Sequence, residues 1–423
     1  MTAAADPTGS SPAFADDPDF GKRPGDAVEM FETCTGCAIC RDACPMFVDL
    51  FGLIEGRDTL GDAGLIGNRR EVLLDKCFQC GLCVRNCPIG FDFPAIAFQH
   101  RMEAAHGGRK AGGLRTLAGA SAWRKLGSIL APVANWLLGS RLFRWLMEKL
   151  TGIDRRQRIA PFSTQTFSGW FRKRLKAATG ELSRGKVLLI VSETVNGHYP
   201  AEGQAAVELL EKSGFEVKVV VLDDVGERAF ASGLKDEAVR NIRRALRQVQ
   251  VLLDGGFEPV ASNTELVHFF QSSSGKLLDS GADSELLPIA ARVRELTAFM
   301  WDCQRRGLLP PPRNEVHETV AWHSACTARA LGTGESGYNL LKTIPGLDIR
   351  RIDAGCCGLG GGWGAAVENF EHAQKSAAQV VTEIQKSGVS LAATACAGCR
   401  VQIAPAAVGT AHPVELYWRS VGE

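Results

Sequence analysis

The positions of the cysteines constrain this chain more than any other feature of its sequence. Its 423 residues include 14 cysteines, eight of them within positions 34–87 and five within positions 326–399. The remaining one, Cys303, stands alone between the two groups. Cysteines gathered this tightly indicate metal sites rather than the disulfide framework of a small secreted domain.

The first group is a motif that occurs twice. The spacing C-x2-C-x2-C-x3-C-P covers residues 34–45 and again residues 77–88. Three thiolates at this spacing bind three iron atoms of one cubane, and the fourth binds the other cluster. Zinc ribbons also use C-x2-C pairs, but four cysteines ending in Cys-Pro fit them poorly. We therefore predict two [4Fe-4S] clusters, one held by Cys34, Cys37, Cys40 and Cys87 and the other by Cys77, Cys80, Cys83 and Cys44.

Two later stretches, 186–270 and 318–405, have the pattern of one α/β unit. Each begins with an apolar strand, passes through a helix and reaches a second strand. Strand–helix–strand order predicts parallel pairing. The predicted strands are 186–191, 215–222, 319–322 and 348–352.

Only the second of these repeats carries cysteines. At the aligned positions the first repeat has Thr194 and the tripeptide 224–226, so we expect one C-terminal cluster and not two. Adjacent thiolates suit a cluster opened beyond a plain cube, because they can reach different iron atoms. The C-terminal cysteines are Cys326, Cys356, Cys357, Cys396 and Cys399, with Gly358 directly after the adjacent pair.

The pattern C…CCG…C-x2-C resembles the CCG-domain iron–sulfur family, which includes the catalytic subunits of heterodisulfide reductases. Further stretches make the chain similar to one branch, the iron–sulfur subunits of anaerobic glycerol-3-phosphate dehydrogenases and their relatives in glycolate and lactate oxidases. The resemblance implies that the five C-terminal cysteines bind a third [4Fe-4S] cluster, noncubane in the best-understood members; a cubane and zinc stay open. The similar stretches are 152–156, 167–171, 344–347, 353–358, 400–403 and 412–416.

The resemblance also implies a function as an electron conduit. A flavoprotein partner would oxidise glycerol-3-phosphate, glycolate or lactate, and this chain would carry the electrons towards quinone. The sequence has no flavin or nicotinamide fingerprint, so we assign it no catalytic residue and expect one component of an oxidoreductase complex rather than a stand-alone enzyme. Two alternatives stay open: a heterodisulfide or thiol–disulfide reductase that uses the C-terminal cluster, and a zinc-stabilised assembly scaffold.

Composition excludes other classes of protein. A formal net charge of +1 provides no basic surface for nucleic acid, so we expect no such partner. Residues 1–28 lack the apolar core of a signal peptide, and free thiols suit a reducing compartment, so we expect a cytoplasmic protein.

The segment 109–176 interleaves aromatic residues with Lys and Arg. Its least polar part, 126–139, has 14 residues and contains Pro132, which is too short to span a bilayer. Such a segment suits a helix lying in the membrane interface, and it equally suits packing onto the C-terminal domain or onto a partner protein. The first interpretation predicts a protein bound peripherally to the inner face of the membrane.

These observations predict an α+β protein in which a helical dicluster module precedes a pseudo-duplicated α/β domain. The expected parts are a disordered segment 1–28, a dicluster ferredoxin domain 29–105, a basic aromatic helical linker 106–183, a degenerate CCG repeat 184–310 and a complete CCG repeat 311–423.

Overall fold

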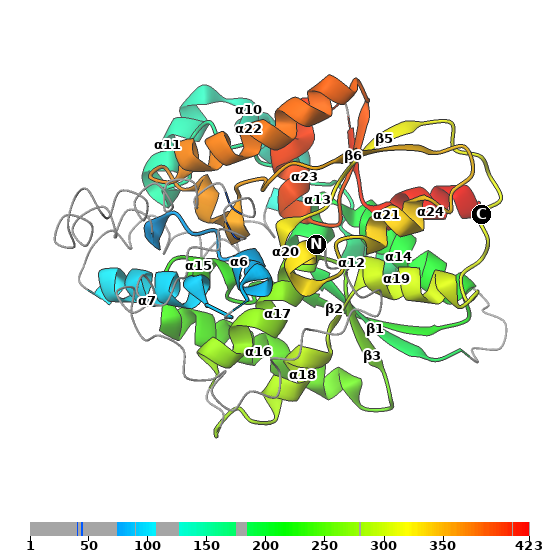
Figure 1. Cartoon of the computed structure of the whole chain (residues 1–423), viewed down its shortest axis with the longest axis horizontal. Helices are drawn as coiled ribbons and strands as arrows, with labels where there is room; N and C mark the ends of the chain where they lie inside the picture. The colour runs from blue at the N-terminus through cyan, green and yellow to red at the C-terminus, as the bar shows by residue number, and fades with distance from the viewer. Residues whose placement is uncertain are drawn as a thin grey trace, which may run out of the picture.

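The centre of the protein is a pair of parallel β-sheets with four strands each (Figure 1). The first sheet has the strand order β2-β1-β3-β4 and the second the order β6-β5-β7-β8. The strands are β1 (Lys186–Ser192), β2 (Glu216–Leu222), β3 (Glu258–Ala261), β4 (Arg294–Glu295), β5 (Thr319–His323), β6 (Asp348–Ile352), β7 (Leu391–Ala393) and β8 (Gly409–Ala411). This computed structural model describes residues 40, 44, 74–88, 90–106, 127–174, 184–278, 281–407 and 409–422.

The two sheets are copies of one topology, and every pair of neighbouring strands in them is parallel. Helices connect the successive strands, as parallel pairing requires, because the chain must return to the same end of the sheet. The predicted α+β fold with a pseudo-duplicated α/β domain is confirmed.

Helices surround both sheets and fill the segments before them. Within the described residues they are α6 (Leu82–Asn86), α7 (Phe93–His106), α10 (Ala131–Gly139), α11 (Arg141–Thr151), α12 (Phe167–Lys173), α13 (Glu193–His198), α14 (Pro200–Lys212), α15 (Glu227–Ala231), α16 (Lys235–Leu253), α17 (Thr264–Leu277), α18 (Leu286–Arg292), α19 (Leu296–Arg305), α20 (Cys326–Leu331), α21 (Ser336–Leu341), η1 (Gly360–Ala365), α22 (Phe370–Ser387), α23 (Ala397–Ile403), η2 (Ala404–Ala406) and α24 (Pro413–Val421).

Strand β1 shows why these segments form a sheet with helices on both faces. Six of its seven residues are buried, which is typical of a parallel strand covered on both sides. Alternate side chains point to opposite faces. Leu189 and Val191 therefore belong to one apolar core, which also contains Trp322 of the second repeat, whereas Leu188 and Ile190 belong to another core. The two repeats thus share a core.

Strand register aligns the two repeats residue by residue. Ile190 pairs with the last residue of β3, just as Trp322 pairs with the last residue of β7. Counting from these positions places Thr194 at the position of Cys326, as the sequence predicts. The same register places residues 225–227 at the CCG tripeptide, one residue later than the predicted 224–226, since Ile190 pairs with Val220 and Trp322 with Arg351.

The segment that precedes the repeats is attached to both of them (Figure 1). Phe98 of α7 stacks on Phe230 of the first repeat, with 4.3 Å between ring centroids. The buried Arg101 guanidinium donates to the carbonyl oxygens of Cys77 at 2.6 Å and Ala231 at 2.9 Å. Helix α6 packs against α20 of the second repeat, where the Arg85 guanidinium donates to a backbone carbonyl.

A buried ion-pair network also connects the two repeats. The Arg400 guanidinium in α23 lies 3.1 Å from a Glu202 carboxylate oxygen in α14 and 2.7 Å from one of Glu415 in α24. Burial raises the pKa of Glu202 to about 8 although Arg400 lowers it. The shared cation therefore compensates part of the cost of burying two carboxylates.

Replacing this cation should destabilise the protein strongly. In Arg400→Met two carboxylates remain buried without a partner, so we expect a loss of about 3–5 kcal/mol in the free energy of unfolding, measured by urea denaturation. The matched variant Arg306→Met removes a mostly exposed ion pair with Asp302 and should cost less than about 1 kcal/mol. Equal losses in the two variants would show that the buried network does not hold the repeats together.

Candidate iron–sulfur site

The five C-terminal cysteines meet at the carboxyl ends of three neighbouring strands. Cys326 opens α20 after β5, Cys356 and Cys357 follow β6, and Cys396 caps α23 after β7, with Cys399 one turn further on. The carboxyl ends of parallel strands lie at one edge of a sheet, which is where ligands of such folds bind. All five side chains are buried.

The sulfur atoms of these cysteines approach one another in pairs. Cys326 Sγ lies 3.6 Å from Cys356 Sγ, and Cys399 Sγ lies 3.1 Å from Cys357 Sγ. Backbone N–H groups also point at sulfur: that of Gly358 donates to Cys356 Sγ at 3.3 Å and that of Cys399 to Cys396 Sγ at 3.2 Å. Such N–H donors stabilise thiolates and raise the reduction potential of a bound cluster.

The glycine of the CCG tripeptide is required by the local backbone. Gly358 has a φ of +81°, in the left-handed region that only glycine adopts readily. A Cβ atom there would lie 2.3 Å from the carbonyl oxygen of Ala373 in α22. Glycine therefore lets the cysteine loop turn sharply against this helix.

The cavity beside these sulfurs is shared with the second cubane motif. Cys80 lines it together with all five C-terminal cysteines, and its thiol is hydrogen-bonded to that of Cys326. Phe78 packs edge-to-face on Trp363 of η1 with ring centroids 5.4 Å apart, and both rings are buried. The two cysteine groups, far apart in the sequence, therefore meet at one place.

The structure locates six of the eight N-terminal cysteines. Cys34 and Cys37 lie outside the described residues. Cys77 is buried and accepts a hydrogen bond at 3.4 Å from the backbone N–H of Gln79. Cys83 lies close enough to Cys77, Cys80 and Cys44 for their charges to act on its pKa, an arrangement that agrees with the predicted crossed ligand set. Cys40, Cys44, Cys80, Cys83 and Cys87 are partly exposed.

Burial controls the chemistry of these thiols. It raises the pKa of Cys77 and of Cys396 to about 11, so both are neutral thiols unless a metal binds them. Cys357 is the exception, because hydrogen bonds from the thiols of Cys356 and Cys399 lower its pKa to about 6. Soft sulfur ligands select iron–sulfur clusters, zinc or copper(I), and a bound metal deprotonates a coordinating thiol.

These residues fit an iron–sulfur cluster. Sulfur atoms from three strand ends line one cavity, and the adjacent pair of the CCG tripeptide has divergent partners, one in α20 and one in α23. Across the described ranges, no three His, Cys, Asp or Glu side chains are placed to hold a single metal ion. Cys303, by contrast, lies in the apolar core shared by the repeats and does not line the cavity.

The cavity has a second wall that the sequence did not reveal. Glu227, Glu265 and His268 line it from α15 and α17, which follow strands β2 and β3 of the first repeat. The carboxyl ends of both sheets therefore face the same cavity. The first repeat has no cysteines to draw attention to these residues, and helical spacing alone does not tell which polar side chains turn inward.

The polar groups of this wall are buried. Burial raises the pKa of Glu227 to about 8, and it also raises that of Glu265, whose carboxylate is hydrogen-bonded to the thiol of Cys396. Burial lowers the pKa of His268 to about 4, and its Nε2 atom has no hydrogen-bond partner among the described residues. Near neutral pH the cavity therefore has a neutral imidazole and a protonated Glu227.

Comparison with known proteins agrees with this geometry. A model of a 4Fe-4S dicluster domain matches residues 27–88, and a model of a cysteine-rich domain, the CCG family, matches residues 320–404. The resemblance to the CCG-domain iron–sulfur family is confirmed. The CCG match covers the second repeat, which holds all five C-terminal cysteines.

Several relatives are similar over much of their length. One subunit, denoted C, of the anaerobic glycerol-3-phosphate dehydrogenase of Escherichia coli (strain K12) is 25% identical over 292 residues, which is 68% of this chain and 71% of that protein. Lactate utilization protein A of Geobacillus kaustophilus is 28% identical over 42% of this chain and 73% of its own length. Lactate utilization protein A 2 of Bacillus cereus is 24% identical over 52% and 89%.

Adding one methyl group at the CCG glycine should disrupt the site. Gly358→Ala combines a left-handed backbone with a clash against Ala373, so we expect destabilisation by about 2–4 kcal/mol and loss of iron from the C-terminal site. Gly388→Ala is the matched control, since Gly388 has a φ of +67° but no atom within 4 Å of the added Cβ, and it should cost about 1 kcal/mol. Thermal unfolding and iron analysis measure both effects. Full iron content in Gly358→Ala would contradict this role.

The cavity carboxyl group should make stability depend on pH. The pKa of Glu227 is raised on folding, so its contribution to stability is complete below its unfolded value of about 4.5 and is lost as pH rises through about 8. We expect Glu227→Gln to reduce the decline by up to about 1.4 kcal/mol per pH unit, measured by denaturation across this range. Glu383→Gln, on the surface of α22, should leave the pH dependence unchanged. A parallel profile in Glu227→Gln would show that this carboxyl group does not titrate with a raised pKa.

Proposed function

We propose that this protein is the iron–sulfur electron-transfer subunit of a flavin-dependent dehydrogenase, and that it passes electrons from a flavoprotein partner towards quinone. The observation that carries the proposal is the contact of Cys80 with Cys326, because it joins the second cubane motif to the CCG cysteines. The relatives add support: one is a subunit of a glycerol-3-phosphate dehydrogenase, and others are lactate utilization proteins. The partner's substrate is accordingly of the glycerol-3-phosphate, glycolate or lactate type.

In this proposal the chain holds three clusters. When bound, they supply one-electron carriers. The cysteines of the second motif and Cys44 hold the cubane next to the CCG site, and Cys34, Cys37, Cys40 and Cys87 hold the other. The CCG cluster is held by Cys326, Cys356, Cys357, Cys396 and Cys399.

The other residues of the site keep the path rigid and dry. Arg101 fixes the loop of the second motif by donating to two of its backbone carbonyls, those of Asp75 and Cys77. Phe78 and Trp363 cover the junction and exclude water. A low dielectric and fixed N–H donors are the means by which a protein adjusts cluster potentials.

A second candidate is a thiol–disulfide reductase in which the CCG cluster acts on a substrate. Reduction of one disulfide takes up two electrons and two protons and yields two thiols. Glu227 and Glu265 favour this candidate, because both carboxyl groups line the cavity and burial raises the pKa of each. They are placed where such protons would be delivered.

Removing one CCG cysteine tests the proposal. We expect the anaerobically purified protein to contain about twelve iron atoms per chain and Cys357→Ser about eight, because one of three four-iron clusters is lost. Electron paramagnetic resonance should show the cubane signals unchanged, whereas electron flow from the co-purifying flavoprotein to a soluble quinone stops. Cys303→Ala, a change in the apolar core, should keep all the iron and the electron flow.

Other outcomes would point to the alternatives. Wild-type protein with about eight iron atoms and bound zinc would contradict the third cluster and support the scaffold. Turnover of a disulfide by the protein alone with an artificial electron donor, lost in Cys357→Ser, would favour the reductase.

A further inference from the structure

Large apolar side chains are exposed mainly at one place in the described part of the chain. Eight of the ten exposed large hydrophobic residues lie on α10, on α11 or on the turn before α10. Trp136 and Leu142 are each 74% exposed, and no described element covers them. We call these eight residues the α10–α11 surface: Ile129, Leu130, Val133, Trp136, Leu142, Trp145, Leu146 and Leu150.

Helical spacing places these side chains on common faces. Ile129, Val133 and Trp136 are four and three residues apart, and Leu142, Leu146 and Leu150 follow at intervals of four. Residues spaced in this way form one stripe along a helix. In Figure 1 α10 and α11 lie side by side at one corner of the molecule, next to α22.

The charge of this region has one sign. Residues 127–151 contain a single acidic residue, Glu148, which is 16% exposed and lies 3.9 Å from Arg155. Arg141 and Lys149 of α11 are exposed. The apolar stripes are thus bordered by cations with little compensating negative charge.

A pocket lined by arginines opens beside the α10–α11 surface. Its volume is about 550 Å³, and five of its lining residues are Arg141, Arg144, Arg155, Arg156 and Arg158. Leu138 and Gly139 at the end of α10 also line it, so the pocket and the apolar stripes are contiguous.

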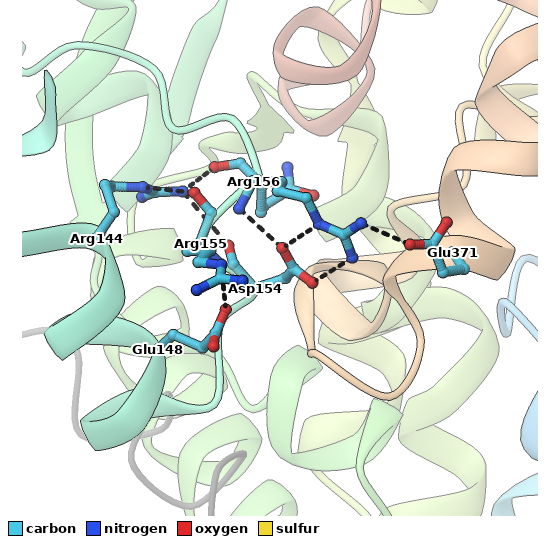
Figure 2. Close-up of polar contacts among 7 residues, drawn as sticks. Arg144, Glu148, Asp154, Arg155, Arg156 and Glu371 are labelled. Atoms are coloured by element: carbon cyan, nitrogen blue, oxygen red, sulfur yellow. Dashed lines mark hydrogen bonds and ion pairs between the residues drawn. The ribbon is translucent and has the colours of Figure 1, made fainter. Parts of the chain in front are cut away.

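Two of these arginines are fixed by the protein itself (Figure 2). Arg156 lies between Asp154, at 2.8 Å, and Glu371 of α22, at 2.7 Å. Arg144 is buried and donates to backbone carbonyls of the loop, including those of Arg155, at 3.1 Å, and Gln157. Burial lowers the pKa of Arg144, as expected for a cation without a carboxylate of its own.

Positive charge remains after these pairs are formed. Three carboxylates, those of Glu148, Asp154 and Glu371, face five guanidinium groups. Arg141 and Arg158 are exposed and have no ion-pair partner among the described residues. A planar guanidinium binds phosphate with two parallel hydrogen bonds, so this pocket suits a phosphate group.

We propose that the α10–α11 surface docks on an anionic phospholipid bilayer, with a lipid headgroup phosphate in the arginine pocket. Exposed Trp and Leu enter the interface while the neighbouring cations meet the headgroups, which is the arrangement of an interfacial amphipathic helix. The protein lies on the bilayer, and none of the described helices is long and apolar enough to cross one. Docking is independent of the electron-transfer function proposed above.

Aromatic residues elsewhere in the same segment give a contrast. Phe167 of α12 is fully buried in the core of the repeats, with Trp170 and Phe171 packed against it. This part of the basic aromatic segment is therefore covered by the protein, whereas Trp136 and Trp145 are not. An acidic surface on another protein would match the charge as well, but the contiguous apolar stripes match the acyl region of a bilayer.

Vesicle flotation of the anaerobically purified full-length protein tests the proposal. We expect binding to vesicles of equal parts phosphatidylcholine and phosphatidylglycerol, weakening with added salt, and little binding to phosphatidylcholine alone. The double variants Trp136→Ser/Leu142→Ser and Arg141→Ala/Arg158→Ala should each bind about tenfold more weakly. Val251→Ser, which removes an equally exposed apolar side chain on α16, should bind like the wild type.

Circular dichroism and iron content confirm that each variant is folded. Unchanged vesicle binding in both double variants would overturn the proposal, as would failure of the wild type to bind either vesicle. If inorganic phosphate binds the pocket but phosphatidylglycerol vesicles do not, the site is one for a small soluble anion and the lipid proposal is wrong. If the variants instead release a co-purifying protein, the surface is a protein–protein interface and the lipid proposal is equally wrong.

Discussion

The burial of sulfur at a single junction is the constraint on which this structure depends. Cys80 from the second cubane motif and the five CCG cysteines line one cavity, so the segments that carry them must be held against one another. Buried thiolates are costly unless a metal or another cation compensates them. The parallel sheets supply three strand ends for this purpose, and Arg101 and Phe98 attach the N-terminal motif to the same place.

Duplication has given the two repeats different roles around that junction. Thr194 and Val225 stand where the second repeat has Cys326 and Cys356, so the first repeat has no sulfur to offer. It closes the cavity instead with Glu227, Glu265 and His268 from the helices after β2 and β3. The same topology thus provides metal ligands in one copy and proton-binding groups in the other.

The sequence predicts the architecture of this protein better than it predicts the site. Apolar runs such as that of β1 and the cysteine spacings are local signals, so the parallel repeats and the candidate ligands follow from them. The contact between Cys80 and Cys326 is tertiary and has no local signal. Glu265 lies on a helix whose pattern leaves several polar positions, and only the packed structure shows that it turns towards Cys396. The one-residue shift at 225–227 has a similar origin, because register is set by pairing across the sheet.

The shared wall of the cavity has a consequence for biosynthesis. Cys80 emerges from the ribosome early, but Cys326 and Trp363, which cover it, are made only when most of the chain has been translated. Until then the second cubane motif is open to solvent and to iron donors, and afterwards it is enclosed. Cluster insertion into this motif therefore has to precede or accompany the docking of the last repeat, so the order of synthesis also sets the order of maturation.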